Sequence, residues 1–325
     1  MSYQIKILIL SFITSVIVSL IVIPILRRLK VGQIERKEGP ESHLKKQGTP
    51  TMGGIVMIIS ILIISVFMYF QYIKTEPEVA KNLIPLVLVT IGFGIVGFVD
   101  DFKKLVLKNT DGLKPALKML GLLIISVAFV IYLVKFMHIG TETLIPMLKQ
   151  YITIPILLYV PFAIVVMLGA TNAVNLTDGI DGLATSITTI IIACLTVIGI
   201  VQEVKEVVIL GSIICGVNLG FLLFNMHPAK VFMGDTGSLL LGGTIASMAL
   251  YLKMPLILLV IALIPVIETI SVIMQVAYFK KTGKRIFKMT PIHHHFELSG
   301  WNENKIVTVF SIVTLVFCVI GLNII

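Results

Sequence analysis

The sequence contains few charged residues: lysine, arginine, aspartate and glutamate together make up 13% of its 325 residues. A soluble globular domain carries about 25% charged residues, so an ordinary soluble fold is excluded. Glycine and proline, at 25 and 13 residues, are close to average usage, which excludes collagen-like and disordered chains. Hydrophobic residues make up 57%, and the mean hydropathy is +1.04. These values indicate a polytopic membrane protein in which residues 1–325 form one helical domain.

Cysteine is also scarce. Cys194, Cys215 and Cys318 all lie inside apolar runs, and neither their odd number nor their spacing matches a disulfide or metal-binding framework. We interpret them as small buried hydrophobic residues. The net charge of +9 does not indicate nucleic-acid binding, because the apolar runs leave no soluble platform on which a basic face could be built. We therefore expect no nucleic-acid partner.

Apolar runs of the length that crosses a bilayer, about 20 residues, recur ten times. The sequence predicts an all-α fold of about ten transmembrane helices. They are expected near residues 5–26, 53–72, 83–99, 117–137, 152–171, 184–201, 207–225, 238–252, 255–278 and 305–324.

The basic residues predict the orientation of these spans. Nineteen of the 26 lysine and arginine residues fall in the loops after the first, third, fifth, seventh and ninth runs. Because cytoplasmic loops are enriched in lysine and arginine, those five loops are expected to face the cytoplasm and both termini to lie outside. The chain is therefore expected to cross its membrane several times.

Aspartates follow the same division. All six lie on the predicted cytoplasmic side, whereas the outside loops contain only glutamate. Carboxylates, imidazoles and ammonium groups from several loops can therefore meet at one membrane face, which predicts a catalytic site at the lipid–water boundary. The aspartates are Asp100, Asp101, Asp111, Asp178, Asp181 and Asp235.

Asp100 and Asp101 follow an apolar run, so they are expected at a helix end near the depth of lipid phosphates. Two adjacent carboxylates repel each other, and burial adds to the cost. A divalent cation or the nearby Lys103 and Lys104 would relieve both penalties. The alternative is an ordinary solvated helix end.

The segment Asn175–Ala184 carries four polar side chains between two apolar runs. Asp178 and Asp181 are three residues apart and would share a face on a helical turn. Asn175 adds an amide to the same region. A polar turn joining two membrane helices is the alternative.

Residues 231–238 read VFMGDTGS, a run that opens the next predicted helix. Its backbone N–H groups and hydroxyls can bind a phosphate, and Asp235 can hold Mg²⁺ because hard cations prefer carboxylate oxygen. The Walker A spacing is absent. An N-cap with a tight turn is the alternative.

Two further segments are candidates for phosphate binding. His293, His294 and His295 lack zinc-site spacing, and we favour phosphate and sugar contacts over structural hydrogen bonding. Residues 48–54, including Thr51, follow Lys45 and Lys46 and suit an anion at the membrane surface. Glu268 lies within a predicted span, is costly in lipid and should face the protein interior.

These segments resemble those of a known family. TPTMGG (49–54), Asp100-Asp101, NLTDGIDGLA (175–184), FMGDTGS (232–238) and PIHHHFEL (291–298) occur in the order found in the polyprenyl-phosphate N-acetylhexosamine-1-phosphate transferases. PIHHHFEL, followed by Gly300-Trp301, favours the branch that transfers phospho-N-acetylmuramoyl-pentapeptide. The resemblance covers essentially the whole chain.

The resemblance implies a reaction and its partners. Phospho-MurNAc-pentapeptide would pass from UDP-MurNAc-pentapeptide to undecaprenyl phosphate, a membrane lipid, giving lipid I and UMP with Mg²⁺. Asp100, Asp101 and Asp235 would be catalytic, with Asp235 the first choice for the metal and Asp100 for the base. Whether the reaction has one step or passes through a covalent phospho-enzyme stays open, as does a homodimer.

The other expected roles are binding roles. Nucleotide contacts would come from Asn175, Asp178 and Phe232, the last by stacking on uracil. Phosphate contacts would come from Lys104, Lys118, Thr51, His293, His294 and His295. Two alternatives remain at this point: a transporter, which would carry midspan charges or inverted repeats, and a transferase for UDP-GlcNAc.

Overall fold

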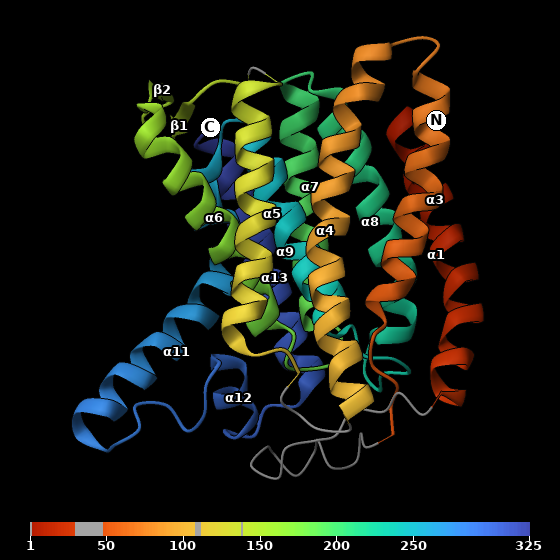
Figure 1. The fold of residues 1–325 in the computed structure, drawn as a ribbon. Coiled ribbons are helices and arrows are strands. Elements are labelled where there is room, and N and C mark those ends of the chain that lie inside the picture. The colour runs from red at the N-terminus through yellow and green to blue at the C-terminus, as the bar shows by residue number, and fades with distance from the viewer. Residues whose placement is uncertain (1, 30–47, 108–111, 138) are drawn as a thin grey trace.

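The computed structural model describes residues 2–29, 48–107, 112–137 and 139–325. Its long helices form a single bundle (Figure 1). In chain order the elements are α1 (Tyr3–Arg28), α3 (Gly54–Tyr72), α4 (Pro77–Leu107), α5 (Pro115–Lys135), β1 (Glu142–Ile145), β2 (Gln150–Thr153), α6 (Ile156–Thr177), α7 (Leu183–Val201), α8 (Lys205–Asn225), α9 (Gly234–Tyr251), η1 (Pro255–Ile257), α10 (Leu258–Ile261), α11 (Leu263–Thr282), α12 (Ile292–Glu297) and α13 (Glu303–Asn323). The strands form an antiparallel hairpin in which Glu142 pairs with Thr153.

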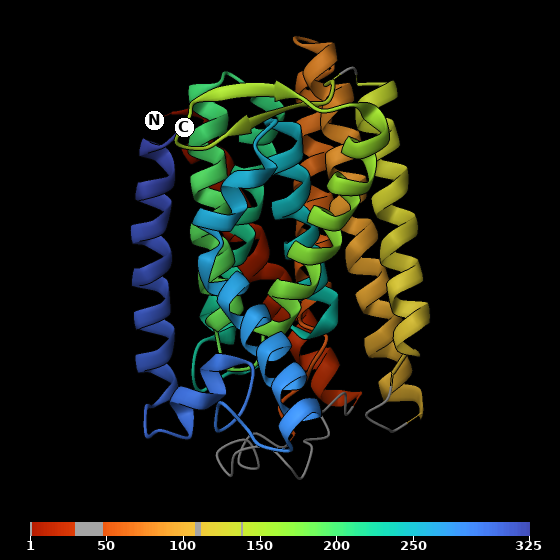
Figure 2. The same ribbon diagram turned by 90° about the vertical axis from the view of Figure 1, so that its left-hand side faces the viewer.

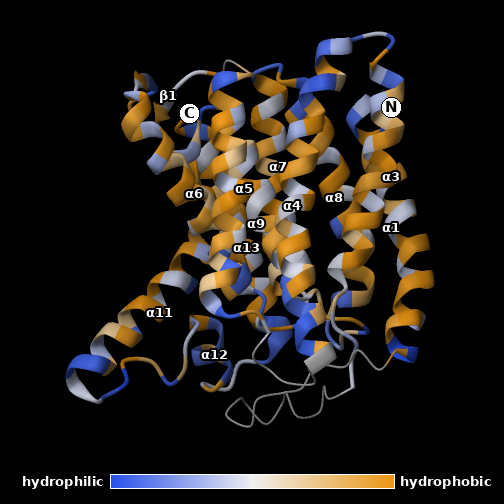
Figure 3. Ribbon diagram, viewed as in Figure 1, coloured by the Kyte–Doolittle hydropathy of each residue, from blue (hydrophilic) through white to orange (hydrophobic). Residues whose placement is uncertain are grey.

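The predicted all-α membrane fold is confirmed. Within the described residues, nine helices are long and apolar enough to cross a membrane, and apolar residues cover their lengths while polar ones gather at the ends (Figure 3). The predicted run 238–252 became α9, which is not among the nine. Every residue from Thr236 to Tyr251 is buried. Because α9 packs against α4 and α6 instead of lipid, it can carry glycine, serine and threonine.

Three predicted boundaries were wrong. Helix α4 was expected to end at residue 99 but continues to Leu107, so Asp100 and Asp101 lie inside the helix; an ion pair with Lys104, one turn further on, supports this extension. The run 255–278 is divided at Ala262, whose φ of −104° and ψ of 32° are not helical. The run expected from residue 152 begins at Ile156, because β2 occupies the preceding residues.

A close approach between α4 and α9 positions these aspartates. A Cβ atom on Gly97 would lie 2.1 Å from the backbone oxygen of Asp235, so only glycine permits this contact. Asp100 and Asp101, one turn further along α4, therefore lie beside the first turn of α9.

Different elements lie at the two ends of the bundle. Both termini and the β1–β2 hairpin lie at one end, whereas α12 and the last turns of α4 lie at the other (Figures 1 and 2). We call the latter the site end. The predicted separation of the loops is therefore present in the described chain. Asp111 lies outside the described residues.

Candidate active site

Three aspartates converge at the site end. One carboxylate oxygen from each of Asp100, Asp101 and Asp235 lies within 4.8 Å of the others. We call these three residues the aspartate cluster. Asp100 and Asp101 are only 3% and 4% exposed. Three carboxylates held this close repel one another strongly unless cations lie between them.

Two lysines supply part of that compensation. The Nζ atom of Lys104 lies 2.7 Å from Asp235 Oδ2 and 2.7 Å from Asp100 Oδ2. Lys118 Nζ lies 3.0 Å from the same Asp235 oxygen. Among the described residues, three carboxylates thus share two ammonium groups, which leaves a formal surplus of one negative charge when all three are ionised. Carboxylate oxygens with surplus charge are the ligands that Mg²⁺ prefers, so these residues fit the implied metal.

Asp101 has a different role from the other two. It accepts hydrogen bonds from the backbone N–H of Asp235 (3.2 Å) and from the N–H and hydroxyl of Thr236 (2.9 and 2.6 Å). A carboxylate at the first turn of a helix satisfies free N–H groups and the helix dipole. The prediction that backbone N–H groups of 231–238 bind phosphate was therefore wrong for these two groups, because Asp101 already occupies them.

Asn175 orients Asp235. Its side-chain amide donates to Asp235 Oδ1 (2.6 Å) and to the Ser238 hydroxyl (2.8 Å). Asn175 lies in the last turn of α6, so this contact joins α6 to the start of α9. The expected nucleotide contact of Asn175 stays a prediction, whereas its hydrogen bond to Asp235 could not be read from the sequence.

Asp178 follows the end of α6 and lies in the turn 178–182. The expected shared helical face with Asp181 was wrong, because α6 ends at Thr177 and α7 starts only at Leu183. Burial, and secondarily the nearby carboxylates of Asp235 and Asp101, raise the pKa of the Asp178 carboxyl to about 8. Asp178 therefore lies within the electrostatic field of the aspartate cluster.

Thr51 and Phe232 lie on two segments that hydrogen-bond to each other. The N–H of Gly53 donates to the Phe232 carbonyl (2.8 Å), and the Phe232 N–H donates to the Pro50 carbonyl (2.8 Å). Both Thr51 and Phe232 are half-buried. Two motifs from distant parts of the sequence thus lie together beside the aspartate cluster. Lys45 and Lys46 lie outside the described residues.

The three histidines have different protein partners in the described structure. His294 Nδ1 lies 3.1 Å from Glu297 Oε2, and His295 Nδ1 accepts the N–H of Lys288 at 3.2 Å. His293 is fully buried, with Nδ1 3.1 Å from Glu268 Oε1. Glu268 is itself 0% exposed, which confirms that it faces the interior.

His293 is the histidine that reaches the turn 178–182. A Cβ atom on Gly179 would lie 2.1 Å from His293 Nε2, so the turn can pack against the imidazole only because residue 179 is glycine. The common phosphate role expected for the three histidines stays a prediction.

Comparison with known proteins shows the family of the chain. The profile of Glycosyl transferase family 4 matches residues 83–253. The chain is 50% identical to a phospho-N-acetylmuramoyl-pentapeptide-transferase of Clostridium perfringens strain 13, over 97% of this chain and 96% of the relative. It is 49% identical to that of Halalkalibacterium halodurans (97% and 95%) and 46% identical to that of Acetivibrio thermocellus (98% and 94%). The chain belongs to the family of phospho-N-acetylmuramoyl-pentapeptide transferases.

The part matched as Glycosyl transferase family 4 runs from α4 through α9 and so contains the aspartate cluster with Asn175 and Asp178. Residues outside it, such as Thr51 and His293, are covered by the nearly full-length similarity to the phospho-N-acetylmuramoyl-pentapeptide transferases.

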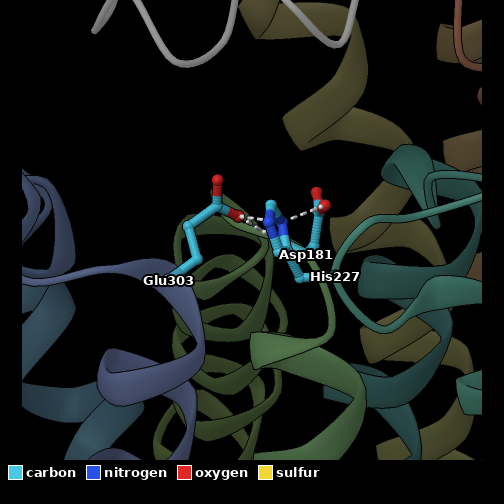
Figure 4. A group of neighbouring side chains, drawn as sticks. All are labelled: Asp181, His227 and Glu303. Carbon is cyan, nitrogen blue, oxygen red and sulfur yellow. Dashed lines mark hydrogen bonds and ion pairs between the residues drawn. The ribbon is translucent and has the colours of Figure 1, made fainter.

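A second cluster joins the turn 178–182, the loop after α8 and the first turn of α13. Asp181, His227 and Glu303 point toward one another (Figure 4), and we call them the Asp–His–Glu cluster. His227 Nδ1 lies 3.0 Å from Asp181 Oδ2, which also accepts the N–H of Ala229 at 3.0 Å. Glu303 Oε2 accepts the N–H of Asp181 at 3.2 Å.

Reasoning from the sequence missed His227 and Glu303. The one available signal was that His227 lies in the same polar segment as Asp235. Nothing in the spacing indicated Glu303, because it belongs to the first turn of the last helix.

Proposed function

We propose that this chain transfers phospho-MurNAc-pentapeptide from UDP-MurNAc-pentapeptide to undecaprenyl phosphate, forming lipid I and UMP in peptidoglycan synthesis. Membership of the family supports this reaction, since the relatives at 46–50% identity carry that name. One substrate is a soluble nucleotide and the other a membrane lipid with an anionic head. A polar site at one end of an apolar bundle suits both.

The observation that carries the proposal is the surplus negative charge of the aspartate cluster. Asp235 is the residue that would hold Mg²⁺, with Asp100 beside it, since the oxygens of Asp101 bind the first turn of α9. Bound Mg²⁺ would neutralise charge on the diphosphate and stabilise the transition state. Phosphoryl transfer depends mainly on such positioning and charge neutralisation.

Lys104 and Lys118 would offset the remaining phosphate charge in this reaction. Asp100 would act as the base that removes the proton from the lipid phosphate. The freed oxygen then attacks the phosphorus attached to MurNAc, the bond from that phosphorus to the oxygen of UMP breaks, and UMP leaves. A route in which an aspartate first forms a covalent phospho-enzyme is the alternative.

The remaining candidate residues would bind substrate. Asn175, Asp178 and Phe232 would contact the nucleotide, and Thr51 with His293, His294 and His295 would contact phosphates. We place the site at the cytoplasmic face of the inner membrane, with both termini outside. The excess of lysine and arginine in the loops of the site end supports this orientation.

UMP release tests the proposal. Purified protein is incubated with undecaprenyl phosphate, Mg²⁺ and either UDP-MurNAc-pentapeptide or UDP-GlcNAc. We expect UMP from the muramoyl donor only, and its loss when EDTA removes the metal. Release of UMP from UDP-GlcNAc alone would make the chain a GlcNAc-1-phosphate transferase. Release of UMP that is unaffected by EDTA would contradict the proposed role of Mg²⁺.

A further inference from the structure

The C-terminal part of α11 leaves the bundle (Figure 1). Every residue from 276 to 286 is exposed, including the apolar Val276, Phe279 and Ile286 at 46%, 49% and 44%. The described part of the chain does not cover these side chains. In a membrane they would lie against lipid, at the depth where the helix reaches the headgroups.

The same stretch is strongly basic. The sequence has no aspartate or glutamate between Glu268 and Glu297, and no ion pair among the described residues involves any of the five cations there. These cations are Lys280, Lys281, Lys284, Arg285 and Lys288. A group of four to eight lysines and arginines directly after a membrane helix is typical of segments that bind anionic lipid headgroups.

A cavity lies within this stretch. Its volume is about 320 Å³, and its lining combines the apolar Val276, Phe279 and Met289 with the cations Lys280 and Arg285. That volume is within the range of small-molecule sites. An amphiphile with an anionic head and an apolar chain matches both parts of the lining.

Hydrogen bonds fix the loop that lines the cavity. Gln275 Oε1 accepts the N–H groups of Ile286 (3.0 Å) and Phe287 (3.1 Å), which ties the loop after α11 back to the helix. Arg285 donates to the carbonyl of Lys288 at 3.3 Å. The walls are therefore formed by the fold itself.

We infer that this cavity binds the headgroup of a resident anionic phospholipid, with its phosphate at Lys280 and Arg285 and an acyl chain along the exposed apolar face of α11. The acceptor lipid is a poorer match. The free end of α11 lies away from the last turns of α4 in both views (Figures 1 and 2), and α4 carries Asp100 and Lys104. A soluble phosphate would leave the apolar part of the lining without a partner.

Lipid retention tests this inference. The full chain is reconstituted in nanodiscs of phosphatidylglycerol and phosphatidylcholine, extracted with mild detergent and examined by native mass spectrometry. Wild type should retain phosphatidylglycerol in preference to phosphatidylcholine, and K280Q/R285Q should lower that preference by at least about fivefold. The matched control K74Q/K81Q removes two exposed lysines at the opposite end and should retain it.

Val276→Trp separates the cavity from a general surface charge. It fills the cavity without altering any cation and should also reduce retention, whereas Val165→Trp, on the exposed face of α6, should not. Unchanged retention in K280Q/R285Q or in Val276→Trp overturns the inference.

UMP release in detergent with added acceptor should be unchanged in all four variants, so a failure here is distinguishable from a failure of the proposed function. If undecaprenyl phosphate displaces the retained lipid and K280Q/R285Q raises the KM for that acceptor, the cavity belongs to the acceptor and the inference is wrong.

Discussion

The aspartate cluster and the Asp–His–Glu cluster lie at the same end of the bundle and both contain carboxylates, but the partners of these carboxylates differ. In the aspartate cluster, Asp235 and Asp100 face the ammonium groups of Lys104 and Lys118, and Asp100 also accepts the N–H of Leu113. In the Asp–His–Glu cluster, the carboxylates accept backbone N–H groups, from Ala229 onto Asp181 and from Asp181 onto Glu303.

This difference separates carboxylates that hold the fold from carboxylates that are available for chemistry. A carboxylate bound to backbone N–H groups is part of the chain's internal structure, whereas a lysine side chain can move aside for a substrate or a metal. By this criterion the Asp–His–Glu cluster braces the start of α13 against the turn 178–182. By the same criterion, Asp101 is more similar to the carboxylates of the Asp–His–Glu cluster than to the adjacent Asp100.

The largest expected effect is on catalysis by Asp235. Asp235→Asn keeps the shape of the side chain but removes the charge that pairs with both lysines and that would bind Mg²⁺. UMP release at saturating Mg²⁺ should fall by roughly 10²–10³-fold, the range seen when a charge-stabilising group is removed. The matched control is Glu203→Gln, an exposed residue after α7, which should behave as wild type. Activity of Asp235→Asn within a few-fold of wild type contradicts the assignment.

Asp101 should affect stability more than Asp100 does. Asp101→Ala leaves two N–H groups and a hydroxyl at the start of α9 without an acceptor, and loss of a helix cap costs about 1–2 kcal/mol. Asp100→Ala removes the acceptor of one N–H, that of Leu113. Thermal unfolding in detergent should rank Asp101→Ala as the less stable variant. Equal stability of the two variants would contradict the different roles assigned to Asp101 and Asp100.

Glu303→Ala tests the bracing role of the second cluster. It leaves the N–H of Asp181 without its acceptor and should lower the free energy of unfolding by about 1 kcal/mol. Because the aspartate cluster is untouched, UMP release should fall far less than in Asp235→Asn. Glu203→Ala is the control. Loss of UMP release at unchanged stability would instead make Glu303 part of the catalytic site.

The smallest effect is a pH dependence of stability. Since the pKa of Asp178 is raised to about 8 from an ordinary 3.8, the folded state holds this proton more tightly than the unfolded state does. The stabilisation is complete below pH 4 and is lost as the pH rises toward 8. In metal-free buffer, the Tm of wild type should fall more between pH 5 and pH 8 than that of Asp178→Asn. Parallel curves would contradict the raised pKa.

The elements and the membership of the site were predictable from the sequence because they depend on local pattern. Apolar runs predicted the helices, and polar groups at the ends of runs marked Asp100, Asp178 and Asp235 as members of one face. The break at Ala262 was not predictable, because the apolar run continues through it and only packing decides where the helix divides.

Roles within the site depend on contacts between distant segments and could not be predicted. Asp101 binds α9 because Gly97 lets the two helices approach, and a sequence pattern does not reveal which of two adjacent aspartates turns toward that helix. His293 pairs with Glu268, and Asp181 with Glu303, across separate elements. No local spacing records either pair.

Binding of Mn²⁺ in place of Mg²⁺, followed by electron paramagnetic resonance on the purified full chain, tests most directly which of the two clusters takes the metal. Wild type and Asp181→Asn should each bind about one Mn²⁺ per chain, whereas Asp235→Asn should bind none at the same concentration. Binding that is lost in Asp181→Asn and retained in Asp235→Asn would contradict the account, because it would assign the metal to the cluster described here as a brace.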